Sequence, residues 1–485
     1  MAQMTEVAST TTNSAPSRKD RVADDKPRHP YDYYYRPGME LRPLPTRAMP
    51  SPAWLPIRKF LAADLVDHEI TLIAQETPAA RLLADHLWQG DEQMDGVVAM
   101  FRRVGAAQGR QMLDQALDHG IETVDDPPAE LVALFEQLDN PPPWHDPETW
   151  ERGRIIWRSA SVAGKIGMFL IDAAYTMMGE DVAAATGSTG WFAQNTLLRT
   201  RDSAAWFASV NLPGAMERFA EPFKDTVRLR LMHAQVRAGM LQSWSDDTFA
   251  HRANPISNSA MAGGLGAFGL SPLIIDRHLG RKISEEELND VTKFFAYTLY
   301  IFGVADELLA KNVRDAMANT EYMASLGGPG MTEWTPQLAG ALHKTLAALP
   351  ALQLGRHAGK LVEEAIVPLL WGYFNFLVGE DMVRVIFDNR AGRKYSTTEL
   401  KILTMVTKNA ISIGPRIGGI LDQLPGAAAR KKRAAVGGDG MLTGMLKLVE
   451  MAVSRADANG PEIVARRASF AGHDSTPSGD FAKIS

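Results

Sequence analysis

One histidine lies where a buried ligand would be expected. His233 falls in the segment 225–237, and Leu229, Val236 and Met240 recur with it at helical spacing beside a second apolar stripe. A helix that is apolar on two stripes is buried, so we expect the imidazole to be buried too. A buried imidazole on an apolar wall is either a core histidine with a satisfied hydrogen bond or an axial ligand of haem iron.

An arginine and a hydroxyl share a second helix face. Arg199 and Ser203 are four residues apart, and Trp206 and Val210 continue the same face at spacings of three and four. This pattern predicts a polar pair that points into an otherwise apolar cavity. The alternative is a helix edge with a solvated arginine.

Further arginines surround the histidine. Arg230 and Arg237 lie within about a turn of His233, as does Arg228. They could neutralise acidic groups such as haem propionates. The alternative is ordinary ion pairing at the protein surface.

Most standard catalytic signatures are missing. The chain has no Gly-x-Ser-x-Gly elbow, no phosphate-binding Walker loop, no His-Glu-x-x-His pair and no Glu-x-x-His pair. The run 264–269 matches Gly-x-Gly-x-x-Gly, but no buried strand precedes it. We therefore interpret that run as a flexible or closely packed loop and not as a dinucleotide site.

Helical periodicity predicts an all-α fold that positions these residues. Apolar residues recur at helical spacing from about residue 57 to 425, two capping boxes open helices at Ser284 and Ser396, and hairpin signals are nearly absent. We expect one large multi-helix domain over 57–425. Residues 1–56 are expected to be disordered to about residue 28 and then to form an extended, Pro/Tyr-rich arm on the main domain. The Tyr31–Tyr35 cluster supports that placement, and an arm that binds a partner is the alternative.

The C-terminal part of the chain, residues 426–485, changes character. It is expected to contain a basic linker at Arg430–Arg433, one further helix over Met441–Val453 and a disordered tail. A nuclear-targeting or nucleic-acid patch at the basic run is the alternative.

Composition limits the function classes. The 485 residues include no cysteine, and 51 Lys+Arg against 57 Asp+Glu give a net charge of −6. Disulfide scaffolds, thiol catalysis, cysteine-based zinc sites and iron–sulfur clusters are thereby excluded. The weak acidity argues against a nucleic-acid partner. The longest apolar stretches, near 365–379 and 294–303, are shorter than the roughly 20 residues of a membrane span, and no secretory signal opens the chain. We therefore predict no transmembrane segment and a cytoplasmic location.

Two runs and one later segment resemble a known family. Leu198–Phe207 and Val227–Arg237, followed by Asn254–Ser257, are similar to the latex-clearing-protein/MpaB-type haem oxygenase family, and the resemblance spans roughly residues 150–379.

The resemblance implies an all-helical fold that encloses a haem b pocket. His233 would be the proximal iron ligand, while Arg199 and Ser203 would lie on the oxygen-binding side. Asp202 stands where rubber-cleaving members carry a lysine, which puts cleavage of long rubber chains in doubt. The family also uses an upstream acid as a base, and Glu180 and Asp181 are the nearest candidates.

The expected function is accordingly that of a haem b-dependent oxygenase or dioxygenase, an oxidoreductase. Arg199, Ser203 and Asp202 are the catalytic candidates, and His233, Arg199, Arg230 and Arg237 are the residues expected to bind haem and its iron. Dioxygen and a small apolar unsaturated substrate, isoprenoid or lipid-like, would be the partners, and the reaction would cleave a carbon–carbon double bond. Assembly into a homo-oligomer is left open. The alternatives are a haem protein without oxygenase turnover, peroxidase-like or sensory, and a helical scaffold that binds partners.

Overall fold

The fold is built from helices. The computed structural model describes residues 29–62, 64–187, 191–328, 332–342, 356–387, 395–438 and Lys447, and within these ranges it contains no β-strand. The predicted all-α class is confirmed. The helices are, in chain order, η2 (Pro52–Trp54), α1 (Leu55–Ala62), α2 (Pro78–Asp85), η3 (His86–Trp88), α3 (Glu92–Val104), α4 (Ala106–His119), η4 (Ile121–Thr123), α5 (Ala129–Asp139), α6 (Pro147–Arg158), α7 (Val162–Met178), α8 (Glu180–Gly187), α9 (Trp191–Val210), α10 (Glu221–Ser243), α11 (Asp246–Arg252), α12 (Asn258–Ala262), η5 (Leu265–Leu270), α13 (Ser271–His278), α14 (Glu285–Ile301), η6 (Asp306–Leu308), α15 (Val313–Ser325), α17 (Arg356–Val378), α18 (Glu380–Phe387) and α19 (Thr397–Leu421).

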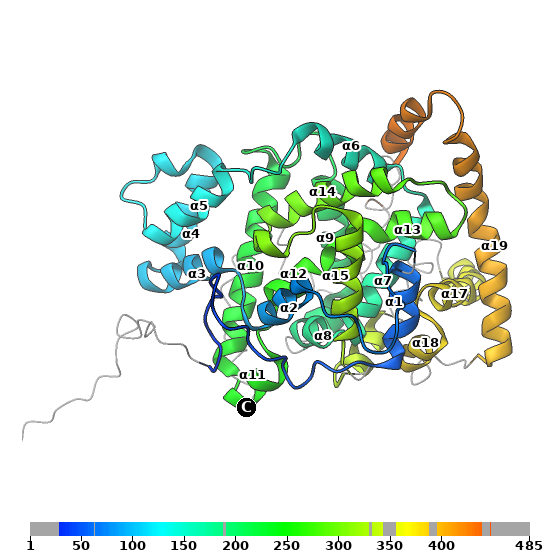
Figure 1. Cartoon of the computed structure of the whole chain (residues 1–485), viewed down its shortest axis with the longest axis horizontal. Helices are drawn as coiled ribbons and strands as arrows, with labels where there is room; N and C mark the ends of the chain where they lie inside the picture. The colour runs from blue at the N-terminus through cyan, green and yellow to red at the C-terminus, as the bar shows by residue number, and fades with distance from the viewer. Residues whose placement is uncertain are drawn as a thin grey trace, which may run out of the picture.

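The middle of the molecule is a stack of long helices. Helices α3, α4 and α5 lie at one end of Figure 1, α19 forms the edge at the other end, and α9, α10, α14 and α15 lie between them. Helix α14 is buried along most of its length and packs on α6, where Trp150 meets Phe294 edge to face at 5.1 Å. Gly153 makes this approach close, because a side chain there would collide with the backbone of Asp290.

Both predicted capping boxes are present. At Ser284 and at Ser396 the hydroxyl accepts from the backbone N–H three residues on, and the glutamate at that position accepts from the cap's own N–H. Each box satisfies two backbone donors that the start of a helix leaves free. They fix the starts of α14 and α19.

The arm lies against the helical body. The His29 ring stacks on Phe249 at 4.9 Å, and the Tyr34 hydroxyl donates to Asp95 on α3 at 2.9 Å. Arg42 forms a buried ion pair with Asp85 at the end of α2, 2.6 Å apart. The arm therefore covers ionic groups of the body as well as apolar surface.

The glycine-rich run 264–269 is part of a helix, not a loop. It enters the π-helical turn η5, which continues into α13. A side chain at Gly266 would collide with Thr320, and one at Gly269 would crowd Phe295 at 2.9 Å. The glycines allow close helix packing, which agrees with the interpretation that no dinucleotide binds there.

One segment is apolar enough to cross a membrane by length and composition. Residues 258–278, which include η5 and α13, pass that test within the described ranges, although 67% of the window is buried inside the protein. The sequence analysis did not single out this segment, because four glycines and several polar residues interrupt it.

Candidate functional site

His233 lies on α10, deep in the helical body, with its imidazole edge-on to Phe302 at 5.1 Å between ring centroids. Burial, together with the positive charges of Arg199 and Arg237, lowers the pKa of His233 to about 3. By surface area the side chain is only partly buried, and no hydrogen bond joins it to a described residue. An enclosed side chain that keeps accessible surface lines an internal space. At neutral pH it is an uncharged imidazole with a free lone pair.

The predicted polar pair lies on α9. Burial lowers the pKa of Arg199, although the carboxylates of Asp172 and Asp202 oppose the shift. Like His233, Arg199 is partly accessible and makes no hydrogen bond or ion pair with a described residue. Ser203, one turn on, is also partly accessible. A desolvated guanidinium without an acceptor is costly, and a bound polar or anionic group would offset that cost.

Asp172 on α7 is a site residue that the sequence analysis missed. Burial raises its pKa to about 6, and the charge of Arg199 acts in the opposite direction. It is the one acidic residue between Ser161 and Gly179, in an otherwise largely apolar segment. A lone acid on an apolar helix was the signal that could have found it. Its pKa makes it able to gain and lose a proton near neutral pH.

Aromatic side chains surround the polar residues of the candidate site. Trp206 on α9 stacks on Phe302 at 5.4 Å and donates its indole N–H to the Thr226 hydroxyl on α10 at 3.1 Å. Phe207 packs on Phe268 of η5 at 4.9 Å. Phe302 therefore connects the tryptophan of α9 to the histidine of α10, and the polar groups lie on an apolar background.

Arg230 and Arg237 do not face the candidate site as free charges. Arg230 pairs with Asp91 at 2.8 Å, and Arg237 pairs with Asp95 on α3 at 2.9 Å. The expected role as partners of haem propionates is not supported, because both guanidinium groups already have carboxylate partners. The ion-pairing alternative holds, but in the interior: both arginines are buried.

Asp202 is the one remaining acidic candidate whose side chain lies among the described residues. Asp202 pairs with its neighbour Arg201, 2.7 Å from the guanidinium Nε, and it influences Arg199 electrostatically. The side chains of Glu180 and Asp181 lie outside the described residues. Asp172 is therefore the acid whose position near the site is established.

A small hollow lies against His233 on the side of the arginine pairs. Asp91, Arg230 and Asn258 line it, and its volume of about 10 Å³ is close to the minimum for one water molecule. Asn258 closes the hollow by donating to the Gly303 carbonyl at 2.9 Å. The Asn254–Ser257 segment leads into this residue, and the Ile256 carbonyl accepts from Arg237 at 2.9 Å. That segment therefore positions α10.

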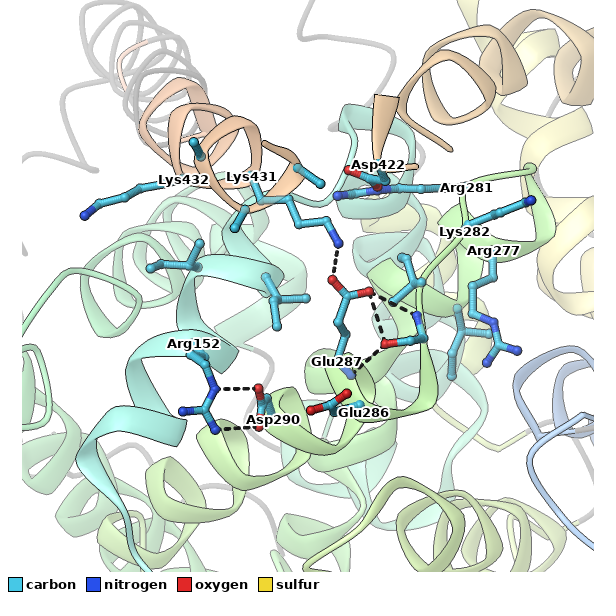
Figure 2. A pocket seen from close by; sticks show the side chains of 18 of the residues that line it. Arg152, Arg277, Arg281, Lys282, Glu286, Glu287, Asp290, Asp422, Lys431 and Lys432 are labelled. Carbon is cyan, nitrogen blue, oxygen red and sulfur yellow. Dashed lines mark hydrogen bonds and ion pairs between the residues drawn. The ribbon is translucent and has the colours of Figure 1, made fainter. Parts of the chain in front are cut away.

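A larger pocket of 1110 Å³ lies elsewhere, and none of the predicted site residues lines it. Figure 2 shows its charged wall, where Lys431 pairs with Glu287 and Arg152 pairs with Asp290 at 3.0 Å. Isoleucines and alanines complete the lining. Because most of its charges are already paired, it is a weaker candidate for chemistry than the site around His233.

The residues around His233 fit a cofactor that takes a single protein ligand. The donor set is one neutral imidazole that no described residue hydrogen-bonds. The aromatic side chains suit a flat apolar ring, and Arg199 offers a positive charge that no described carboxylate contacts. Within the described ranges, no group of three or more histidine or acidic side chains is arranged to hold a metal ion.

Comparison with known proteins finds one family and one solved structure to report. Residues 157–378 match the family described as ER-bound oxygenase mpaB/B'/Rubber oxygenase, catalytic domain. The structure titled "Structure of Latex Clearing Protein LCP in the closed state" is similar in fold, with a TM-score of 0.51 and 18% identity over 73% of this chain and 91% of that one. No curated protein matches the sequence. The family resemblance predicted from the sequence is confirmed, and the matched range contains Asp172, Arg199 and His233.

Proposed function

From the mpaB/rubber-oxygenase catalytic domain matched by residues 157–378, we propose that this protein is a haem b-dependent oxygenase. Its substrate is small, apolar and unsaturated, isoprenoid or lipid-like, and the reaction is oxidative cleavage of a carbon–carbon double bond. The observation that carries the proposal is the enclosed, neutral His233, which hydrogen-bonds no residue in the described part of the chain. The charge of Arg199 acts on it, and Asp172 in turn interacts electrostatically with Arg199.

His233 would hold the haem iron. When bound, haem supplies the activation of dioxygen, and the protein supplies orientation and electrostatics. The low pKa of His233 keeps its lone pair available at neutral pH. Arg199 provides hydrogen-bond donors and positive charge from a neighbouring helix. Trp206 and Phe302 exclude water and stabilise an apolar substrate, at about 0.8 kcal/mol for each buried methylene.

Asp172 is the proposed base, in place of Glu180 or Asp181. With a pKa of about 6, its carboxylate is mostly deprotonated at pH 7 and able to accept a proton. Arg199 stabilises the deprotonated form. Ser203 presents a hydroxyl that can orient a polar group. Asp202 carries a charge opposite to the lysine of rubber-cleaving members, which supports short substrates over long rubber chains.

The test is a comparison of histidine variants. His233→Ala should lose most of the haem absorbance near the Soret maximum, while far-ultraviolet circular dichroism stays unchanged. His251→Ala is the matched control, because its exposed ring hydrogen-bonds Thr46 of the arm at 2.8 Å. Because the chain has no cysteine for a thioether bond, acidic organic solvent should extract the haem. Full-length protein made with adequate haem that shows no Soret band would refute the proposal.

A further inference from the structure

Helix α19 carries its large apolar side chains on the wrong face for a helix that is stabilised by burial alone. Its buried positions are Leu400 near the start and then only small or ring-closed residues, Thr407, Ser412, Pro415 and Gly419. A side chain at Gly419 would meet the Gly280 carbonyl at 2.7 Å, so the small residues allow close packing. The exposed apolar residues of the helix and the turn after it are Ile402, Met405, Val406, Ile413, Ile417, Ile420, Leu421 and Leu424.

These exposed residues form a continuous surface, the α19 face. Ile402 to Leu421 spans 20 residues of α19, which corresponds to about 30 Å of helix, and Leu424 lies in the turn after it. Exposed Ile366 and Leu369 of α17 extend it, since the Thr407 hydroxyl donates to the Leu369 carbonyl at 3.2 Å. In Figure 1, α19 forms one edge of the molecule, with α17 on its inner side. Exposed apolar patches of this extent mark interaction sites.

The segment that carries the α19 face is basic, although the whole chain is acidic. Residues 397–437 contain seven Lys/Arg and two Asp/Glu, a formal charge of +5, in a chain whose net charge is −6. Lys282 and Lys432 at the rim of the charged pocket are exposed and have no partner among the described residues, and Arg433 is exposed beside them. The C-terminal end of the α19 face therefore offers free ammonium groups.

We propose that the α19 face docks the protein on an anionic lipid bilayer. An exposed apolar helix face flanked by Lys and Arg is the pattern of helices that lie in the headgroup region and bind anionic lipids. A second copy of the chain fits less well, because it would bring +5 against +5. The isoleucines enter the acyl boundary, and Lys282, Lys432 and Arg433 contact phosphates. This inference does not depend on the proposed oxygenase activity.

The experiment is flotation of the full-length protein with vesicles. We expect it to float with phosphatidylcholine vesicles that contain phosphatidylglycerol, to bind pure phosphatidylcholine more weakly, and to lose affinity as salt rises. Ile413→Glu together with Ile417→Glu should weaken binding about tenfold or more, because affinity scales with buried apolar area. These side chains are 61% and 54% exposed, so the variant should fold normally, which circular dichroism can check.

Matched controls separate this surface from general stickiness. Ile73→Glu changes an isoleucine that is 73% exposed outside the α19 face and should leave flotation unchanged. Lys432→Glu with Arg433→Glu should weaken binding to the anionic vesicles alone. Arg103→Glu on α3, at the other end of Figure 1, should have no effect.

Three results would overturn the proposal. The first is that the unaltered protein does not float with anionic vesicles. The second is that the Ile413→Glu/Ile417→Glu variant floats as well as the unaltered protein. The third is a dimer in analytical ultracentrifugation that this variant dissociates, without any vesicle binding, which would make the α19 face a subunit interface.

Discussion

At the residue scale, three ionisable side chains are buried without a contacting ion-pair partner among the described residues, which is costly for stability. His233, Arg199 and Asp172 are enclosed enough for burial to shift each pKa toward its neutral form, yet no ion pair at contact distance joins them. Groups held this way are costly for stability, and such costs concentrate at functional sites. The same positions are therefore where substitutions separate function from folding.

Removing Arg199 should affect turnover more than folding. Arg199→Ala, compared at equal haem content, should lower kcat by about 10² to 10³, the usual effect of losing a preorganised donor. Ser203→Ala should cost less, because water can replace a hydroxyl. The assay is oxygen consumption and carbonyl formation with short isoprenoids and unsaturated fatty acids. Full activity of Arg199→Ala would show that the guanidinium has no catalytic role.

Asp172 predicts a pH dependence with a defined sign. Because its folded pKa is about 6, above the ordinary 3.8, folding favours the protonated acid. Burying the ionised Asp172 carboxylate therefore lowers the free energy of unfolding. This loss is absent below about pH 4, grows as pH rises, and is complete above pH 6, where it reaches at most about 3 kcal/mol. Asp172→Asn should therefore raise stability to urea at pH 7 but not at pH 4.

The same carboxylate should be visible in the kinetics. If Asp172 is the base, kcat/KM should rise with pH through about 6, and Asp172→Asn should remove that limb. An unchanged pH profile in the variant would assign the base to another residue.

At the element scale, α10 is held by paired charges with matched spacing. Arg230 and Arg237 are two turns apart on α10, while Asp91 caps α3 and Asp95 lies one turn into it, so both ion pairs form at once. This attachment fixes the rotation of α10 and with it the direction of His233. The pairs act on the site through orientation and not through contact with a ligand.

Removing one partner of the Arg237–Asp95 pair should lower the free energy of unfolding strongly, while replacing both partners by apolar residues should lower it little. Arg237→Met leaves Asp95 without its ion-pair partner in the interior and should lower the free energy of unfolding by about 3–5 kcal/mol. Adding Asp95→Leu should recover most of that loss. The more exposed pair between Arg103 of α3 and Glu130 of α5 is the control, worth at most about 1 kcal/mol. Urea unfolding measures the stability of the single variant, the double variant and the control variant. Equal losses for the two ion pairs would show that burial of the Arg237–Asp95 pair has no special effect on stability.

Sequence periodicity predicted which residues share a helix face, but not which helices contact one another. It placed His233 in the interior, Arg199 and Ser203 on one face, and both capping boxes at helix starts. It could not show that Asp91 and Asp95 meet the arginines of α10, because that contact joins residues about 140 positions apart. Asp172 was missed although it is a lone acid in an apolar segment, and its electrostatic interaction with Arg199 emerges only in the fold. The domain boundaries and the roles of the site residues remain predictions.

At the scale of the whole molecule, the arm contributes to stability. Arg42 satisfies buried Asp85, and Tyr34 donates to Asp95 beneath α10. A protein that begins at Leu44 leaves Asp85 without its ion-pair partner and exposes the apolar surface around Trp88, which contacts Tyr31. We expect its thermal midpoint to fall by several degrees, because loss of a buried partner costs about 3–5 kcal/mol. Deleting residues 1–28 alone should leave the midpoint unchanged, and equal effects of both deletions would disprove a stabilising arm.

The distance along the chain between the arm and its partners also orders events during synthesis. His29 meets Asp246 across 217 positions, and Arg58 of α1, just after the arm, meets Glu321 across 263. A ribosome that adds about 5–20 residues each second needs tens of seconds to produce those partners after the arm has emerged. Tyr34 finds Asp95 sooner, across only 61 positions, whereas His29 waits until Leu241 and Asp246 have been made. The start of the first described segment is therefore among the last parts of the chain to dock, and a chaperone that holds it during translation would favour correct folding.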